Sequence, residues 1–211
     1  MITAANLPWY RLNYVVISVQ GTGPRVAERP DLVELTAMSI EDGTLDDPVT
    51  WELRPDHLIT PHAMRAYGTT NRDVRFRPKF AAVAGAIRNY FDVAIPVGHN
   101  VRRSLGMLSR KLPEWRPAEA FDTLRMARSA MGVREQRLRI LAEQLGLTAG
   151  IPDAPGERRT AWDALMTARL FLRLANNSGR PLTVAELRER GQWLCPHPES
   201  QMQLLEPGWT Q

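Results

Sequence analysis

The sequence predicts one α/β domain built on a mixed β-sheet that helices cover on both faces. Residues 13–53 contain three short, strand-like runs separated by turn residues, which indicates an antiparallel meander. After Pro55 the pattern changes, because apolar residues then recur every three or four positions, the spacing of amphipathic helices. Antiparallel strands followed by strands that alternate with helices are typical of a mixed sheet with helices on both sides.

The three consecutive strands come first. One is predicted at residues 13–19, where a β-branched run is followed by the turn Gly21-Thr22-Gly23. The second is expected at residues 32–40 and the third at residues 49–53, with Glu41-Asp42-Gly43 as the turn between them. Connections of this kind favour antiparallel neighbours.

Amphipathic helices and two further strands fill the rest of the domain. The first of these helices begins near Pro78, and another follows His99-Asn100. The brief apolar strands are expected at residues 94–97 and 120–122. The apolar residues that define the helices are, in chain order, Phe80, Val83, Ala84, Ile87 and Phe91; Leu105, Leu108 and Leu112; Leu124, Ala127 and Met131; Leu138, Leu141, Ala142 and Leu145; and Ala164, Ala168, Phe171 and Leu172.

The domain is expected to span residues 1–175, with residues 176–211 as a C-terminal extension. A linker-like Asn-Asn-Ser-Gly run begins the extension. Beyond it, Thr183 and Glu186 have the spacing of a capping box, and Gly191 is placed to end that short helix. The remainder of the extension shows no period, so we expect an irregular tail.

Composition excludes some classes of protein and leaves others open. No run approaches the length of a membrane span, and residues 1–10 lack the pattern of a secretory signal. The single cysteine, Cys195, excludes an internal disulfide, and we expect a cytoplasmic protein. The net charge of +4 permits an acidic partner. All but two of the 27 basic residues are arginine, a skew that fits either a selected binding face or codon usage.

Six local patterns follow one another between residues 13 and 175. The first is residues 15–23, Val-Val-Ile-Ser-Val-Gln-Gly-Thr-Gly, and the third is residues 98–104, Gly-His-Asn-Val-Arg-Arg-Ser. The six resemble, in order and spacing, the landmarks of the DnaQ-like (DEDDh) 3′–5′ exonuclease family. That family's first strand normally reads apolar-Asp-x-Glu-Thr-Thr-Gly, and its later motif reads His-Asn-x-x-Phe-Asp. The other four patterns are residues 31–35, 121–124, 138–146 and 158–164.

The resemblance implies a ribonuclease H-like fold, with a five-stranded mixed sheet flanked by helices. It also implies a site along the first strand, at the start of the helix after His99, and on the helix around Asp163. An active member holds two divalent ions there with four carboxylates, and a histidine takes a proton from the attacking water. Magnesium-like ions need hard oxygen ligands, preferably anionic ones.

Four of the five functional positions are substituted in this chain. A guanidinium group cannot act as the base, because its pKa stays above about 12. The single remaining carboxylate cannot offset the charge of two divalent ions, so we do not expect ordinary two-metal hydrolysis. We therefore expect no cofactor, and Mg²⁺ or Mn²⁺ only if residual activity exists. The family positions are Ser18 and Gln20 for the first-strand carboxylates, Ser104 for the third carboxylate, Arg158 for the histidine, and Asp163, which is kept.

Other acidic residues are candidates for replacing the lost ligands. Glu34 and Asp122 stand where active relatives often carry the same residue, so structural roles are the favoured interpretation for both. Asp153 and Glu157 lie in a loop close to Arg158. Rescue of a metal site by that loop is the less favoured alternative.

Arginines replace negative charge around the expected site. Arg102, Arg103, Arg158 and Arg159 all map close to it. Arginine binds phosphate oxygens bidentately without a cation, so one hypothesis is that the cleft holds a nucleic-acid or nucleotide phosphate without cutting it. The alternative is that Arg102 and Arg103 follow the helix period, with one facing solvent and the other pairing with nearby acids. For Asp163, pairing with Arg158 or Arg159 is favoured over the alternative of retained metal binding.

Thr22, Gly23, Tyr67 and Asn100 complete the set of candidate nucleic-acid-binding residues. Thr22 and Gly23 match the loop that approaches the substrate's terminal nucleotide in relatives, and a plain turn explains them equally well. Tyr67 stands where the family usually has histidine, and either stacks on a base or packs against the sheet edge. Asn100 is a good N-cap for the helix that follows.

We therefore predict a catalytically inactive exonuclease homologue that binds single-stranded nucleic acid or a nucleotide through an arginine-lined former active cleft. One alternative is a protein-interaction or scaffold subunit of a nucleic-acid-processing complex. In that case the C-terminal extension, with Trp193 and Trp209, contacts the partner. Another alternative is a weak metal-dependent exonuclease with a remodelled site. No membrane partner is expected.

Overall fold

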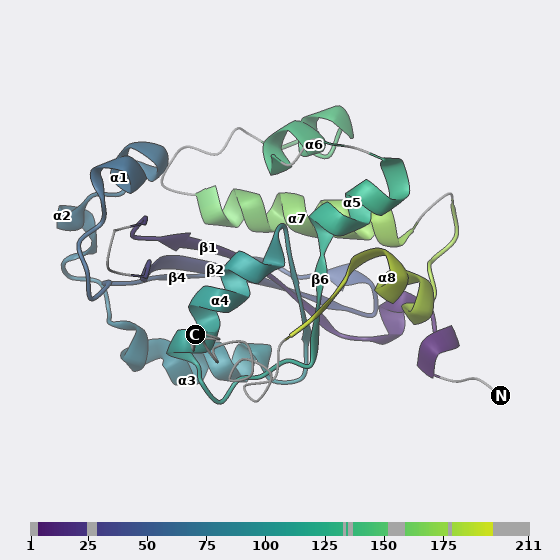
Figure 1. Ribbon diagram of the computed structural model, residues 1–211, viewed down its shortest axis with the longest axis horizontal. Helices are drawn as coiled ribbons and strands as arrows, with labels where there is room; N and C mark the ends of the chain where they lie inside the picture. Colours follow the sequence, from purple (N-terminus) through teal and green to yellow (C-terminus); the bar gives the residue numbers. More distant parts are fainter. Residues whose placement is uncertain are drawn as a thin grey trace, which may run out of the picture.

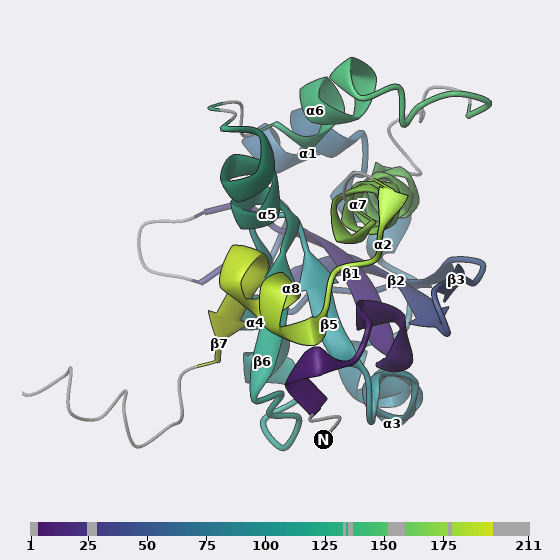
Figure 2. The same cartoon turned by 90° about the vertical axis from the view of Figure 1, so that its right-hand side faces the viewer.

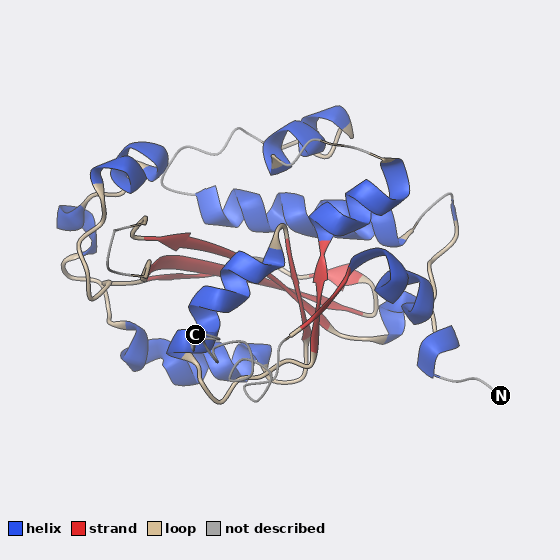
Figure 3. Ribbon diagram, viewed as in Figure 1, coloured by secondary structure: helices blue, strands red, loops and turns tan. Residues whose placement is uncertain are grey.

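A mixed β-sheet forms the centre of the computed structural model, which describes residues 4–24, 29–132, 134, 137–151, 159–176 and 179–195. The strands are β1 (Tyr14–Gly21), β2 (Leu32–Glu41), β3 (Thr44–Leu45), β4 (Val49–Glu52), β5 (Ile95–Gly98), β6 (Glu119–Asp122) and β7 (Gln192–Leu194). Their order is β3-β2-β1-β5-β6-β7, and β4 also pairs with β2. Figure 3 shows the strands in red at the centre, with helices around them. β2 is antiparallel to β1 and β4, whereas β5 is parallel to both β1 and β6. The predicted mixed sheet is confirmed.

Among the described residues the sheet has seven strands, two more than the five expected. The five expected strands are β1, β2, β4, β5 and β6. β3 has two residues and follows a turn in which Gly43 adopts a positive φ of 76°. β7 has three residues and pairs antiparallel with β6. Strands of two or three residues are too short to show an alternating period, so the sequence pattern did not reveal them.

Helices cover both faces of the sheet (Figure 1). α7 (Arg159–Ala175) lies along one face with α6 (Leu138–Gln144) packed on it, while α3 (Phe80–Phe91) and α4 (Val101–Lys111) lie on the other face. In the described part of the chain, no helix is both long and apolar enough to span a bilayer. The helices are η1 (Ala4–Asn6), η2 (Trp9–Arg11), α1 (Pro61–Tyr67), α2 (Asn71–Val74), α3 (Phe80–Phe91), α4 (Val101–Lys111), α5 (Thr123–Met131), α6 (Leu138–Gln144), α7 (Arg159–Ala175) and α8 (Val184–Gly191).

The central strand β1 is buried on both faces along its first half, which explains its continuous apolar run. Tyr14 and Val16 belong to the core under α7. Val15 and Ile17 belong to the opposite core, under α3 and α4. Successive residues of a strand alternate between faces, so the direction of any later side chain of β1 follows from this register.

Trp9 joins the beginning of the described chain to its C-terminal part. Its side chain is 2% exposed and packs on the rings of Tyr14 and Phe171, with centroid separations of 6.0 Å and 5.6 Å. The backbone N–H of Trp9 donates to the carbonyl of Leu182 at 2.9 Å, and the indole Nε1 donates to Oδ1 of Asn176 at 3.1 Å. Residues on both sides of Asn176 therefore pack on one core.

α8 begins at the predicted capping box. The Glu186 N–H donates to Thr183 Oγ1 at 3.2 Å, and the Thr183 N–H donates to Glu186 Oε2 at 2.8 Å. From α8, Arg188 reaches Glu119 of β6 at 2.7 Å. Figure 2 shows α8 and β7 beside β6, at the edge of the sheet opposite β3. The expected irregular tail beyond residue 195 lies outside the described residues.

Candidate functional site

The carboxyl end of β1 extends beyond β5, because β5 pairs only with the first three residues of β1. Ser18 lies opposite Thr36 of β2, and Gln20 lies opposite Glu34. Thr160, in the first turn of α7, hydrogen-bonds to Thr36 Oγ1 at 2.8 Å and donates to Glu34. Opposite residues of an antiparallel pair share one face of a sheet, so Ser18 and Gln20 both face α7.

Two helices bring the other positions to the same end of β1. Ser104 lies in α4 and is 8% exposed. Met107, three residues further along α4, lies against the end of β1, since a Cβ on Gly21 would be 3.1 Å from its Sδ. Asp163 lies three residues after Thr160 in α7. Four of the five positions that the family resemblance singled out therefore gather around the carboxyl end of β1; the fifth, Arg158, lies outside the described residues.

Gln20 is the most deeply buried of these four side chains, with 3% of its surface exposed. Its Oε1 atom accepts no hydrogen bond from any described residue. Burying a neutral amide oxygen costs much less than burying a carboxylate without a cation. A glutamate at this depth would be stabilised by a bound cation, whereas the glutamine is compatible with a site that holds none.

Asp163 is the one carboxylate kept at the family positions, and an arginine holds it. Arg159 Nε lies 3.7 Å from Asp163 Oδ2. The Arg159 guanidinium also donates to the carbonyl of Ala66 at 3.3 Å and lies 5.9 Å from the ring centroid of Tyr67. Arg159 thus connects the start of α7 to the end of α1. The alternative partner, Arg158, lies outside the described residues.

These donor groups do not fit a pair of divalent cations. Two serine hydroxyls and one amide provide neutral oxygens, and the single carboxylate already has a cationic neighbour. Divalent ions of the magnesium type need several anionic oxygens to offset their charge. Within the described ranges, no three His, Cys, Asp or Glu side chains are grouped so that they could hold a metal ion.

The neighbouring acids Asp122 and Glu34 have structural partners. Asp122 is 5% exposed, and its carboxylate accepts three backbone N–H groups, at 2.9–3.2 Å, at the starts of α4 and α5. Glu34 is 7% exposed and accepts from Thr160, and burial raises the pKa of its carboxyl group. Asp153 and Glu157, the loop candidates for rescue, lie outside the described residues.

Asp163 gives the protein a pH-dependent stability. Burial raises the pKa of Asp163 to about 6, against the opposing effects of Arg159 and Arg139. An unfolded aspartate titrates near pH ~3.9, so the folded state binds the proton more tightly. Stability is therefore greatest below that value and falls as the pH rises towards about 6. The side chain is 31% exposed, and solvent screening limits the loss to about 1–2 kcal/mol.

Asp163→Asn is expected to remove this contribution and to flatten the loss of stability between about pH 4 and pH 7. Urea unfolding of both proteins across that interval measures it. Glu34 adds a fall of the same sign in both proteins, so the difference between them isolates Asp163. Identical pH profiles would contradict the raised pKa of Asp163.

Arg102 and Arg103 lie apart from Arg159, on the exposed side of α4. They line a pocket of about 400 Å³ between this helix and the segment that leads into β2. Ser104, the next residue, is turned to the buried side of the same helix. Arg102 also lies 5.7 Å from the ring centroid of Trp193 in β7. The predicted arginines are thus divided between two places rather than lining one cleft.

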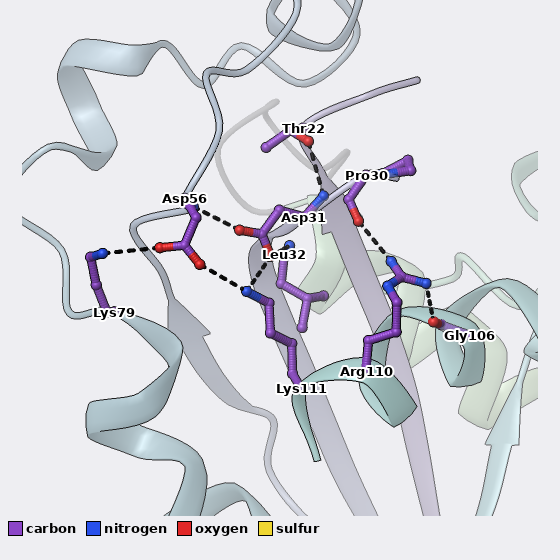
Figure 4. A network of polar contacts seen from close by, with 9 residues as sticks. All are labelled: Thr22, Pro30, Asp31, Leu32, Asp56, Lys79, Gly106, Arg110 and Lys111. Carbon is purple, nitrogen blue, oxygen red and sulfur yellow. Dashed lines mark hydrogen bonds and ion pairs between the residues drawn. The ribbon is translucent and has the colours of Figure 1, made fainter. Parts of the chain in front are cut away.

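Thr22 and Gly23 lie in the segment that follows β1, and Figure 4 shows Thr22 beside Asp31. Thr22 is 1% exposed, and its Oγ1 accepts the N–H of Asp31 at 3.0 Å. The Thr22 N–H donates to the carbonyl of Asp31 at 2.9 Å. Gly23 has a φ of 84°, and a Cβ there would overlap Oγ1 of Thr60. Contacts within the fold therefore account for both residues.

Tyr67 and Asn100 also have structural surroundings. Tyr67 is half-buried against the small core beneath α1 and α2. Asn100 occupies the N-cap of α4, but its own side chain makes no capping hydrogen bond. The capping oxygens come from Asp122 instead. Asn100 has a φ of 58°, a left-handed conformation that asparagine tolerates better than most residues, and it lines the pocket with Arg102 and Arg103.

Two pocket arginines, Arg29 and Arg110, were absent from the sequence prediction. Arg110 had a usable signal, because it lies seven residues after Arg103 and two helical turns bring both to one side of α4. Arg29 lies outside any helix or strand, so no periodic pattern in the sequence could indicate its place in the pocket. The sequence also did not reveal a row of alternating charges beside this pocket, which Figure 4 shows: Lys79–Asp56 at 3.0 Å, Asp56–Lys111 at 3.2 Å and Lys111–Asp31 at 2.7 Å.

The sequence matches the model of one known protein family. A family model described as Exonuclease matches residues 19–171, well over half of the chain. The chain belongs to the exonuclease family. This confirms the resemblance to DnaQ-like exonucleases that the sequence motifs indicated.

Curated relatives of this exonuclease-family chain include two bacterial exonucleases. The 3′-5′ exonuclease DinG of Bacillus subtilis (strain 168) is 26% identical over 166 residues, which are 76% of this chain and 17% of that protein. Exodeoxyribonuclease 10 of Escherichia coli (strain K12) is 28% identical over 149 residues, 70% of this chain and 64% of that protein. The chain thus spans less than two thirds of both relatives.

Solved structures share the fold. Exonuclease X in complex with 5′ overhanging duplex DNA has a TM-score of 0.66 and 24% identity, covering 83% of this chain and 98% of that chain. The nuclease domain of 3′hExo, a DEDDh family member bound to rAMP, has a TM-score of 0.66 and 14% identity, covering 83% and 96%. The predicted ribonuclease H-like fold is confirmed by these neighbours.

Proposed function

We propose that this exonuclease-family chain binds single-stranded nucleic acid, or a nucleotide, without hydrolysing it. The observation that carries the proposal is the set of donors at the end of β1. Ser18, Gln20 and Ser104 offer only neutral oxygens, and Asp163 lies beside Arg159. If two divalent ions were bound at these positions, they would lack the anionic ligands that two-metal hydrolysis requires. The sheet and helices that position these residues are nevertheless retained.

Positive charge around this end of the sheet supports a phosphate-bearing ligand. The chain carries a net charge of +4; Arg159 lies beside Asp163 on α7, and Arg102 and Arg103 lie on the exposed side of α4. Arginine binds phosphate oxygens bidentately and needs no metal ion to do so. Among proteins of this fold, exonuclease I of E. coli has been solved in complex with a dA16 oligonucleotide. These observations together favour nucleic acid as the class of ligand.

We expect a fluorescently labelled oligothymidine to bind in the presence of EDTA, as measured by fluorescence anisotropy. Affinity should fall as salt rises, with a log–log slope of about −0.7 for each phosphate contacted. Contacts with three phosphates correspond to roughly a twentyfold loss between 50 and 200 mM salt. Competition by mononucleotide separates a nucleotide site from a strand site. Absence of oligothymidine binding at low salt would contradict the proposal.

A second candidate function is contact with a protein partner through the C-terminal extension. Leu194 is 69% exposed on β7, a strand that lies at one end of the strand order. An edge strand presents unpaired backbone groups to which a partner strand can add. Such a contact depends on apolar burial and backbone hydrogen bonds, so its affinity should change little with salt, unlike phosphate binding.

A further inference from the structure

The pocket on the outer side of α4 has two walls of different origin. Arg103, Gly106 and Arg110 lie on one side of the helix, at the spacing of successive turns. Arg29 and Pro30, which precede β2, form the other wall. The Arg110 guanidinium donates to the Pro30 carbonyl at 2.7 Å and to the carbonyl of Gly106, so it joins the two walls.

Positive charge in this pocket is not balanced by its own lining. Arg29, Arg102, Arg103 and Arg110 line it, and none of the described lining residues is acidic. Neither Arg29 nor Arg103 forms an ion pair or side-chain hydrogen bond with a residue that the structure describes. Burial, followed by the charge of Arg29, lowers the pKa of Arg110, while Asp31 opposes this effect. Four like charges so placed favour the arrival of an anion.

Nearby acids are engaged elsewhere. Asp31, which is 6% exposed, pairs with Lys111 at 2.7 Å, and its Oδ2 accepts the N–H of Asp56 at 2.7 Å. Asp122, at the start of α4, is occupied by the three backbone N–H groups that it caps. Both carboxylates therefore have partners within the fold, and neither lines the pocket. The Asp31 contacts also fix the start of β2 against the end of α4, which holds the two pocket walls in place (Figure 4).

We infer that this four-arginine pocket binds a backbone phosphate of a single-stranded nucleic acid. Its volume of about 400 Å³ is enough for a phosphate with its adjoining sugar, within the range of small-ligand sites. Guanidinium groups supply paired donors in the geometry that phosphate oxygens need. The inference rests on the proposed function and adds a location to it. The phosphate lies on the outer side of α4, so its binding does not involve Ser104 or Asp163.

Two pairs of matched substitutions test this location. Arg103→Gln removes one pocket charge, and Arg173→Gln removes one charge from the exposed side of α7, on the opposite face of the sheet. Gly106→Glu adds a carboxylate to the pocket, and Gly85→Glu adds one to α3. A Cβ at either glycine meets no atom within 4 Å, so both helices accommodate the change.

We expect Arg103→Gln to weaken oligothymidine binding at least tenfold at ~0.1 M salt and to reduce the salt slope by about 0.7. Gly106→Glu should abolish binding, while Arg173→Gln and Gly85→Glu each change it by less than about threefold. Thermal melting of each variant establishes that it is folded. If the two arginine variants, or the two glycine variants, lost oligothymidine affinity equally, the pocket would not be the phosphate site. The proposed function would still hold. If the natural protein bound no oligonucleotide, both the pocket assignment and the proposed function would be wrong.

Inorganic phosphate separates anion binding from strand binding. Phosphate stabilises most proteins by exclusion from their surfaces, so only the difference between two proteins is informative. At about ten times its dissociation constant, phosphate should raise the Tm of the natural protein by about 3 °C more than that of Gly106→Glu. Equal rises in both proteins would contradict an anion site in this pocket. A difference without oligonucleotide binding would instead identify a site for a free phosphate and overturn the strand assignment.

Discussion

Replacing Ser18 by Asp, Gln20 by Glu and Ser104 by Asp in one variant will give the chain an Mn²⁺-dependent gain in thermal stability that the natural sequence lacks. These three positions surround the carboxyl end of β1 together with Asp163. Four carboxylates there repel one another, and the buried position of Gln20 makes its replacement costly without a cation. A bound cation relieves both effects, so the metal should stabilise the folded state selectively.

The expected size of this effect follows from mass action. Mn²⁺ at one hundred times its dissociation constant stabilises the folded state by about 2.7 kcal/mol, or roughly 5–10 °C in Tm for a chain of this length. Without metal, the variant should melt below the natural protein. A neutral control, Ser18→Asn with Ser104→Asn, adds similar bulk without charge and should show no metal response. If the natural protein gained as much from Mn²⁺ as the triple variant, the donor argument would be wrong.

Replacing Asp122 by Ala will destabilise the fold by about 3 kcal/mol, because three backbone N–H groups, two of them in buried hydrogen bonds, lose their acceptor. Its carboxylate accepts from Asn100 at 3.1 Å, Val101 at 3.2 Å and Leu124 at 2.9 Å, and so caps two helices at once. The corresponding fall in Tm is about 6–12 °C. Asp122→Asn keeps one acceptor oxygen and should cost roughly half as much.

Asp47→Ala provides the matched control for this substitution, because Asp47 is an exposed carboxylate in the loop before β4. Its removal should change the free energy of unfolding by less than about 0.5 kcal/mol. Urea unfolding measures all three variants. A cost for Asp122→Ala as small as that for Asp47→Ala would mean that the two helix starts do not depend on this carboxylate.

Much of the fold could be predicted because the sequence patterns of its helices and strands are local and long enough to show a period. The β-branched run of β1, the helical spacing in α3 and the capping box at Thr183 and Glu186 are each contained within a few neighbouring residues. β3 and β7 were missed because two or three residues show no alternation. Long-range contacts such as the pairing of Trp9 with Leu182 leave no trace in a local pattern.

The candidate site, like the fold, could be predicted from the sequence only in part. The family motif placed Ser18, Gln20, Ser104 and Asp163, and the structure brings these positions to one end of β1. Side-chain direction was harder to predict. Arg103 and Ser104 are adjacent in the sequence, yet one faces the outer pocket and the other the sheet. Arg29 enters the pocket from a loop, so only the three-dimensional arrangement identifies it.

Binding without hydrolysis is the central claim, and adding metal to the binding assay tests it most directly. A labelled single strand is incubated with the protein and Mg²⁺ or Mn²⁺, and both its length and its bound fraction are measured. Asp163→Ala serves as the parallel control for the one carboxylate that remains. We predict a strand that stays intact and an affinity that EDTA does not change. Metal-dependent shortening of the strand that Asp163→Ala abolishes would contradict the account.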